Sequence, residues 1–268
     1  AILSVSLSCA RTGARVLKKP LYKYIREIYK IKEKDYRMPV PTMNILNGGR
    51  HADNNLPIQE FMIIPRHRLL RERIRIGSQI FHALANLLSQ KGYSIGVGDE
   101  GGFAPNVKTN ERAIQLILDA INTTKWKAGK DVFLGFDFAA SEFFRKDKYY
   151  FASSKQGWSA EKLIKTMEEW IKKYPIISIE DGLAEDDWVN WEKLTKKLGK
   201  KINLIGDDLF VTNSKRLQKG IDEKVGNAIL IKLNQIGTLS ETIKTIQLAR
   251  KNKYAISVSH RSGETVDT

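Results

Sequence analysis

Cysteine is nearly absent from this 268-residue chain, with Cys9 as the single example. One thiol excludes an internal disulfide framework and a metal site built from several cysteines, and it favours a reducing compartment such as the cytoplasm. The sequence also has no run of about 18 apolar residues, so no membrane-spanning helix is predicted. Proline is sparse, at seven residues, and no stretch rich in Pro, Gly or Ser divides the chain. The simplest expectation is one folded domain.

Acidic residues are the scarcer charge, with 30 Asp and Glu against 45 Lys and Arg, which gives a formal net charge of +15. Such an excess raises the question of nucleic acid or an anionic surface as a partner. The densest basic stretch, residues 66–76, begins a helical pattern with Leu69, Ile76, Ile80 and Leu87 on one side. Because the arginines mostly take the other sides, we interpret them as a solvated helix face.

Short apolar runs alternate with amphipathic stretches after Tyr36, which is typical of an α/β fold. The predicted strands are residues 38–46, 60–64, 132–138, 176–180, 203–207, 228–232 and 254–259. The predicted helices are residues 66–91, 110–124, 159–173, 187–198, 214–224 and 238–251, with Ser159 as a helix N-cap. Seven strands are one fewer than a (β/α)₈ barrel needs, so either the sheet is open or the chain stops before its barrel does.

Polar residues stand at or just after the ends of five consecutive strands: Asp137, Glu180, Asp207, Lys232 and His260. Their spacings are 43, 27, 25 and 28 residues, and a spacing near 25 is about one βα unit. The carboxyl ends of parallel strands meet at one rim, which is where barrel active sites lie. We therefore expect these five side chains to gather at that rim.

Three of those side chains are carboxylates, and with no cysteine nearby they favour a hard divalent cation such as Mg²⁺. The structural alternative is that they pair with Lys or Arg, and Lys232 is a candidate for that partner. A lysine beside a metal and shielded from water can also serve as a base. A metal with a lysine base is the pattern for removing a proton next to a carboxylate.

Two polar loops add further candidates. His51 lies in the Gly-containing loop 47–55, and Glu100 lies in the loop 96–102. The second loop formally contains GxGxxG, but two carboxylates occupy it and Pro105 follows, so it is a poor dinucleotide site. Its better use is to present Glu100 on a backbone that bends sharply. A plain tight turn between helices is the structural alternative.

Six stretches of the sequence indicate a particular family. Together they resemble the enolases, the glycolytic phosphopyruvate hydratases. The stretches are residues 38–62, 98–106 (GDEGGFAPN), 178–183 (SIEDGL), 206–213 (GDDLFVTN), 232–238 (KLNQIGT) and 259–265 (SHRSGET). The resemblance covers nearly the whole chain.

The resemblance implies reversible dehydration of 2-phosphoglycerate to phosphoenolpyruvate with two Mg²⁺ ions. Carried over residue by residue, Asp137, Glu180 and Asp207 would hold the first metal. Lys232 would take the α-proton, and Glu100, supported by Glu60, would protonate the departing hydroxyl. The substrate-binding residues would be His51, His260, Arg261 and Ser262, the last two on the phosphate.

The family's fold is a (β/α)₈ barrel that opens with two adjacent strands and two helices, and the implied architecture here is that barrel truncated to about seven strands. Residues 1–37 would be a helical lead-in from an N-terminal domain that the chain lacks, and residues 38–268 an incomplete catalytic barrel. Such an internal fragment is expected to be poorly stable and inactive alone. The intact enzyme would be a dimer or larger oligomer in the cytoplasm.

Two other functions are kept open. One is another member of the enolase superfamily that acts on a different acid, although the loops with Glu100 and His260 are signatures of enolase itself. The other is a non-catalytic protein that binds RNA or an anionic surface through its Arg-rich helix.

Overall fold

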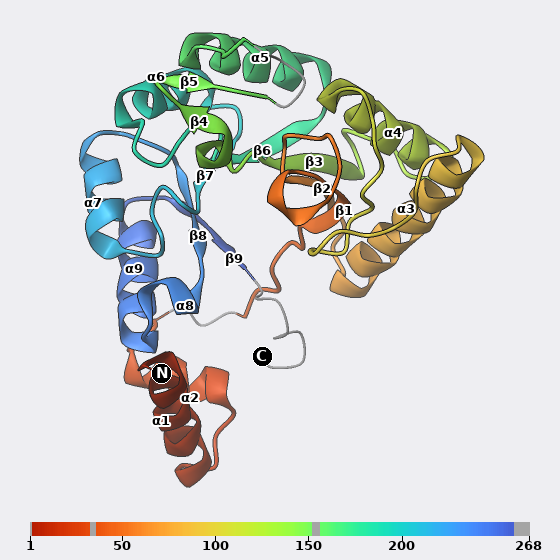
Figure 1. The fold of residues 1–268 in the computed structure, drawn as a ribbon. Coiled ribbons are helices and arrows are strands. Elements are labelled where there is room, and N and C mark those ends of the chain that lie inside the picture. Colours follow the sequence, from red (N-terminus) through yellow and green to blue (C-terminus); the bar gives the residue numbers. More distant parts are fainter. Residues whose placement is uncertain (1, 33–35, 152–155, 260–268) are drawn as a thin grey trace.

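The computed structural model describes residues 2–32, 36–151 and 156–259, and in it seven strands form one curled sheet (Figure 1). Their order is β1-β2-β3-β6-β7-β8-β9. The strands are β1 (Met43–Asn47), β2 (Glu60–Pro65), β3 (Val132–Asp137), β6 (Ile176–Glu180), β7 (Asn203–Gly206), β8 (Ala228–Ile231) and β9 (Ala255–Val258). The pairs β1/β2 and β2/β3 are antiparallel and all later pairs are parallel. The α/β fold predicted from the sequence is confirmed, including all seven strands.

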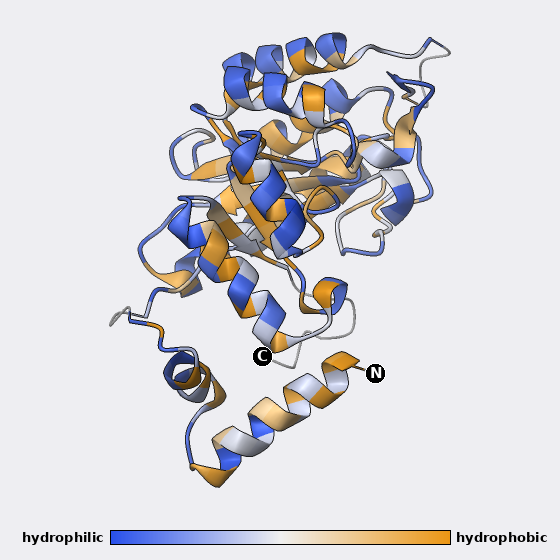
Figure 2. Ribbon diagram, turned by 90° about the vertical axis from the view of Figure 1, so that its left-hand side faces the viewer, coloured by the Kyte–Doolittle hydropathy of each residue, from blue (hydrophilic) through white to orange (hydrophobic). Residues whose placement is uncertain are grey.

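The helices lie around the outside of the curled sheet (Figure 1). They are α3 (Leu70–Gln90), α4 (Asn110–Asn122), α5 (Ala160–Lys173), α6 (Trp188–Leu198), α7 (Ser214–Asp222), the short α8 (Leu233–Ile236) and α9 (Leu239–Lys251). In Figure 2 the strands are largely hydrophobic, while the helices around them alternate hydrophilic and hydrophobic turns. Amphipathic helices of this kind bury one stripe against a sheet.

Two helices, α1 (Ile2–Val16) and α2 (Leu21–Ile28), form a separate pair next to α9. The Leu239 N–H donates to Ser6 Oγ at 3.0 Å, and the hydroxyls of Tyr29 and Ser240 lie 2.8 Å apart. The helical character expected for the first 37 residues is therefore present at residues 2–16 and 21–28.

Some predicted boundaries were wrong. The first strand begins at Met43 rather than Met38, because Pro39 and Pro41 have no N–H to give to a strand ladder. Helix α3 begins at Leu70 rather than Arg66, so His67 precedes the helix, where its Nδ1 accepts from the Leu69 N–H at 3.1 Å.

Other local details came out as predicted or were not foreseen. The Ser159 cap is confirmed, since its hydroxyl accepts from the Lys162 N–H. A small hairpin of β4 (Phe144–Arg145) and β5 (Lys148–Tyr149) was missed. Its strands are too short to leave a periodic signal, and both turn residues, Lys146 and Asp147, have positive φ, as a type I′ turn requires.

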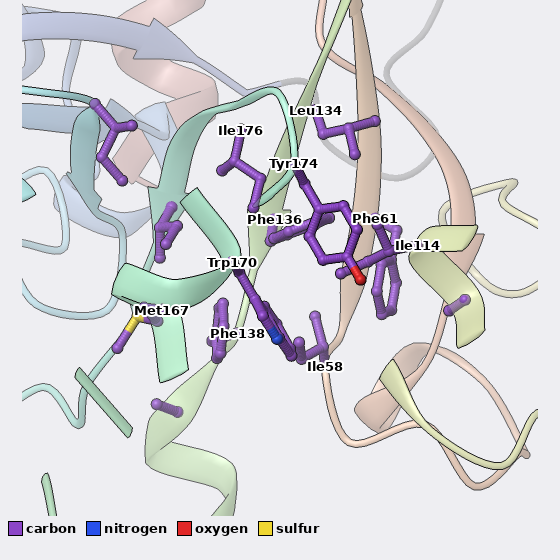
Figure 3. Close-up of a cluster of buried hydrophobic side chains, with 14 of the residues drawn as sticks. Ile58, Phe61, Ile114, Leu134, Phe136, Phe138, Met167, Trp170, Tyr174 and Ile176 are labelled. Atoms are coloured by element: carbon purple, nitrogen blue, oxygen red, sulfur yellow. The ribbon is translucent and has the colours of Figure 1, made fainter. Parts of the chain in front are cut away.

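The outer face of the sheet is a continuous aromatic and aliphatic core. Phe61 of β2, Phe136 of β3 and Ile179 of β6 are neighbours across adjacent strands. The Phe136 ring lies 5.3 Å from that of Phe61 and 6.1 Å from that of Trp170 on α5, and Figure 3 shows these side chains packed together. Burying such side chains is the main driving force for the layer of helices to cover this face.

The packing of the outer face decides what the inner face presents, because successive side chains of a strand point to opposite sides. Phe61, Phe136 and Ile179 point outward, so the residues beside them in sequence, Glu60, Asp137 and Glu180, point inward. A separate buried cluster on the inner face consists of Ile205, Ala228 and Leu230. Residues two apart in a strand point to the same side, so Asp207, two after Ile205, and Lys232, two after Leu230, are also expected on the inner side.

Among the described residues, no helix is both long enough and apolar enough to cross a bilayer.

Asn227 fastens the turn before β8 to the turn before β7. Its Oδ1 accepts from the Leu204 N–H at 2.7 Å, and its Nδ2 donates to the carbonyls of Gly199 and Ile202 at 2.8 and 2.9 Å. Asn227→Ala leaves these three backbone groups without partners, and we expect the free energy of unfolding to fall by about 1–3 kcal/mol. Urea denaturation measures it. The control is Asn203→Ala, an exposed position at the start of β7. An equal loss of unfolding free energy in the two variants would show that the hydrogen bonds of Asn227 do not stabilise the fold.

Candidate active site and metal centre

A row of carboxylates crosses the inner face of the sheet at its carboxyl rim. Glu60 is the cross-strand neighbour of Asp137, and Asp137 is that of Glu180. Asp207 follows on the end of β7. Asp137, Glu180 and Asp207 are only 5%, 7% and 6% exposed, so they stand in a largely dry environment.

Asp207 is held by two side chains that come from the end of β8 and from α8. The Lys232 ammonium is in direct contact with its Oδ2, and Gln235 Nε2 donates to Oδ1 at 2.7 Å. The pairing of Lys232 with a rim carboxylate, raised as the structural alternative, is therefore present. Lys232 is also the only Lys, Arg or His of the described residues that lies within 4 Å of a carboxylate of Asp137, Glu180 or Asp207.

Lys232 is positioned by a strained turn. Val211 and Thr212 both have positive φ, at 43° and 54°, which is a genuine outlier for β-branched residues. The Thr212 hydroxyl accepts from the Lys232 N–H at 2.8 Å and lies 2.9 Å from Gln235 Oε1. The strained turn thus fixes both of the groups that contact Asp207.

Asp137 is fixed by hydrogen bonds to its two oxygens. Gln59 Nε2 donates to Oδ2 at 3.1 Å, and the Ala139 N–H donates to Oδ1 at 2.9 Å. Gln59 was not foreseen from the sequence, although it stands next to the predicted Glu60.

Asp181 is a second residue that the sequence analysis missed. It is 3% exposed, has φ +39°, and accepts from the N–H groups of Asp207 and Asp208 at 3.0 and 2.7 Å. It therefore ties the end of β6 to the end of β7 and sets where Asp207 stands. The signal that could have found it is its place directly after the predicted Glu180.

Burial raises the pKa of Asp137, Glu180 and Asp181 well above the usual range for a carboxyl group. Neighbouring carboxylates add to the rise: Glu60 acts on Asp137, Asp137 on Glu180, and Asp207 on Asp181. The pKa of Asp208 is raised for the same two reasons, burial first and then Asp207. Burial and mutual repulsion therefore oppose the simultaneous ionisation of the carboxyl groups of the rim.

An excess of buried carboxylate oxygens beside one ammonium fits a divalent cation with oxygen ligands. Asp181, Asp207 and Asp208 offer ligand atoms that all lie within 4.8 Å of one another. The predicted set of Asp137, Glu180 and Asp207 is not among the groups brought together that closely, although Asp207 is shared. The donor chemistry thus fits Mg²⁺, and Asp207 belongs to both sets.

A second cluster contains His51, Glu60 and Glu100, whose ligand atoms also lie within 4.8 Å of one another. His51 Nδ1 is 3.3 Å from Glu60 Oε1. Glu60 is at the same time the strand neighbour of Asp137. This cluster therefore lies next to Asp137 on the carboxyl rim, with β3 and β6 between it and the end of β7, where Asp207 stands.

The loop with Glu100 reaches this cluster because glycine permits a close approach. The Asp99 N–H donates to the His51 carbonyl at 2.9 Å, and the Gly102 N–H donates to Asn47 Oδ1 at 2.8 Å. A Cβ at Gly98 would stand 2.4 Å from the His51 carbonyl oxygen. The loop is thus docked against Asn47 and His51 and brings Glu100 into this cluster.

The charge of Glu60 acts on His51. The adjacent Glu60 carboxylate raises the pKa of the His51 imidazole above its usual value, burial opposes the rise, and Glu100 and Asp99 add to it. His51 is therefore biased toward the charged form beside two glutamates.

The structure places seven of the ten predicted site residues on one rim. His51, Glu60, Glu100 and Asp207 are members of the two clusters, Lys232 contacts Asp207, and Asp137 and Glu180 lie on the neighbouring strand ends. The other three, His260, Arg261 and Ser262, lie outside the described residues. Chemically, the rim combines carboxylates that could hold a cation, an amine on a buried carboxylate and a second group of acidic side chains along the sheet.

A family model described as the enolase C-terminal TIM barrel domain matches residues 35–268.

The first prediction from this site concerns His51. Glu60→Gln removes the largest cause of the raised imidazole pKa, so we expect the pKa of His51 to fall toward about 6.5. Glu100→Gln removes a lesser cause and is expected to lower it less. NMR titration of the His51 ring protons measures both. A larger shift from Glu100→Gln than from Glu60→Gln would contradict the geometry.

The second prediction concerns the inner carboxylates. Their pKa is higher in the folded than in the unfolded state, so each destabilises the fold increasingly as pH rises above the unfolded pKa of about 4, and the loss is complete above the folded pKa. We expect Asp137→Asn to raise Tm at pH 8 in EDTA, with little effect at pH 4. Mg²⁺ should raise the parent's Tm at pH 8 more than that of Asp137→Asn.

The matched control is Glu192→Gln on the exposed face of α6. It should leave both Tm and its response to Mg²⁺ unchanged. Equal Mg²⁺ responses in the parent and in Asp137→Asn would exclude Asp137 from the cation site.

Proposed function

The chain belongs to the enolase C-terminal TIM barrel family, and on that premise we propose that its protein interconverts 2-phosphoglycerate and phosphoenolpyruvate by reversible dehydration. The observation that carries the proposal is the arrangement of the carboxyl rim. Lys232 contacts the buried Asp207, and the cluster of His51, Glu60 and Glu100 lies further along the same rim, where Glu60 is the strand neighbour of Asp137. A base and an acid separated along one rim are what a dehydration across two adjacent carbons needs.

Lys232 is proposed as the base that takes the proton next to the substrate carboxylate. It is 17% exposed in its side chain and contacts Asp207, so its ammonium is already held in a largely dry site. To accept a proton it has to be neutral, and a cation bound to Asp207 would favour that form by taking up the charge of the carboxylate that now holds the ammonium.

Asp137, Glu180 and Asp207 are proposed to hold the first Mg²⁺, with Asp181 and Asp208 fixing or extending that set. When bound, Mg²⁺ supplies positive charge that stabilises the enediolate formed on proton removal. The buried carboxylates supply the fixed oxygen ligands, and Gln59 and Gln235 hold two of them in orientation.

Glu100 is proposed as the acid that protonates the departing hydroxyl so that it leaves as water. Its loop is docked on Asn47 and His51, which fixes its approach to the rim. Glu60 lies within the same cluster and is proposed to support Glu100 in that role. His51 is proposed to line the substrate.

His260, Arg261 and Ser262 are proposed to complete the substrate site, with the Arg261 fork and Ser262 on the phosphate. The division into a helical lead-in, residues 1–37, and a catalytic barrel, residues 38–268, is proposed with the same function. A dimer or larger oligomer and a cytoplasmic location also stay predictions of the family resemblance.

The test uses the full-length product of the gene that contains this sequence. We expect Mg²⁺-dependent formation of phosphoenolpyruvate from 2-phosphoglycerate, and a loss of about 10²–10⁴-fold in kcat for Lys232→Ala and for Glu100→Gln. The two variants should differ in one respect. Exchange of the C2 proton of 2-phosphoglycerate with deuterium oxide should persist in Glu100→Gln, because its base is intact, and be lost in Lys232→Ala.

Lys215→Ala, an exposed position on α7, is the control and should keep full activity. A folded, Mg²⁺-binding parent that leaves 2-phosphoglycerate unchanged but removes an α-proton from another carboxylic acid would contradict the proposal. It would then assign the protein to a different reaction of the enolase superfamily.

A further inference from the structure

A basic surface on α3 and the α4–β3 loop has no part in the proposed chemistry. It comprises Arg75 and Lys125, which lie over the Trp126 ring, and five further cationic side chains of the same two segments, Arg66, Arg68, Arg71, Lys127 and Lys130. We call this set the Trp126 patch. It lies where β2 ends and β3 begins, at the opposite end of these strands from Glu60 and Asp137, since Pro65 is the strand neighbour of Val132.

The two segments of the patch are joined by direct contacts. The Arg66 N–H donates to the Asp131 carbonyl at 2.7 Å, and the Arg66 guanidinium lies 5.8 Å from the centre of the Phe133 ring. Arg75 and Lys125 lie 5.5 and 4.9 Å from the centre of the Trp126 ring. These contacts bring the basic segments 66–75 and 125–130 side by side.

Nearby acidic groups leave most of this charge exposed. Glu72 is engaged by Arg75 at 2.5 and 3.0 Å, and Asp131 Oδ2 accepts from the Lys127 N–H at 3.0 Å. Arg68, Arg71 and Lys130 are exposed, and none of them has an ion pair within the described part of the chain. A solvated helix face explains single arginines on α3, but it does not explain why the loop lysines gather on the same surface.

Trp126 gives the patch an aromatic surface in a fixed orientation. Its indole N–H donates to Gln79 Oε1 at 2.9 Å, and the ring is half-buried. Half-exposed aromatic rings set among Lys and Arg are the usual platform for single-stranded nucleic acid, on which bases stack while cations bind phosphates.

The same observations argue against a lipid bilayer. Binding to a membrane surface needs apolar side chains on the cationic face. Leu69, at 39% exposed, is the one large apolar side chain exposed beside the patch. Ile74 is also exposed, but it lines a cavity together with Met43 and Phe81.

We propose that the Trp126 patch binds single-stranded RNA, with its Lys and Arg side chains on successive phosphates and Trp126 against a base. The proposal is independent of the dehydration, because none of the residues of the patch belongs to the carboxyl rim.

The test measures fluorescence anisotropy of a labelled 20-nucleotide single-stranded RNA with the full chain, over a series of salt concentrations. Lys125→Ala/Lys127→Ala/Lys130→Ala is expected to weaken binding about 10- to 100-fold near 0.1 M salt. It should also reduce the slope of log K against log salt by about 2, at about 0.7 per phosphate contact. Lys196→Ala/Lys215→Ala/Lys244→Ala removes the same charge from exposed positions on α6, α7 and α9 and should change affinity less than about 3-fold.

Trp126 is tested separately with Trp126→Leu and Trp126→Phe, each first shown to be folded by its Tm. Loss of the ring in the Leu variant should weaken RNA binding about 5- to 100-fold, and the Phe variant should retain most of the affinity. Inorganic polyphosphate, which has no bases, should bind the parent and the Leu variant alike.

Three results would overturn the proposal. Equal weakening by the two triple variants would mean that only net charge matters. Trp126→Leu binding RNA as tightly as the parent would mean that no base is recognised. Vesicles with anionic lipid that bind the parent as tightly as RNA, and lose that binding in the Lys125→Ala/Lys127→Ala/Lys130→Ala variant, would assign the patch to a membrane surface instead.

Discussion

The alternation of side chains along the sheet is the constraint on which the rest of this structure depends. Phe61, Phe136 and Ile179 must face the helices to form the core, and this leaves Glu60, Asp137 and Glu180 facing inward in one row. A slip of one residue in a strand would exchange the two sets and destroy core and rim together. The hydrophobic packing of one face therefore builds the acidic site on the other.

The acidic rim costs the fold stability, because burial and mutual repulsion raise the pKa of its carboxyl groups. The chain offsets part of that cost with fixed donors: Gln59 and the Ala139 N–H on Asp137, and Gln235 and Lys232 on Asp207. Three residues beside these groups, Asp181, Val211 and Thr212, have positive φ, which is a strained backbone conformation. Backbone strain and unbalanced charge at one place in the fold are typical of a functional site.

The sequence predicted the site residues that recur at the ends of successive strands. It missed the residues whose role depends on contacts between neighbouring strands and loops. Strand ends at Asp137, Glu180, Asp207 and Lys232 were visible because apolar runs and βα spacing mark them. Asp181 and Gln59 were not, because their role comes from hydrogen bonds between neighbouring strands, which no single segment encodes. The meeting of His51 with Glu100 rested on the family resemblance, and its physical reason, the docking of Gly98 and Gly102 on the first strand, is visible only in three dimensions.

The most direct test of this account is isothermal titration calorimetry of Mg²⁺ binding in buffers of different ionisation enthalpy, which counts the protons released. Because burial holds protons on the rim carboxyl groups, the account predicts that Mg²⁺ binding releases protons, with more released at pH 6 than at pH 8. Glu180→Gln should weaken binding and reduce that release. Mg²⁺ binding that releases no protons at either pH, or that Glu180→Gln leaves unchanged, would contradict the claim that the inward carboxylates form the cation site.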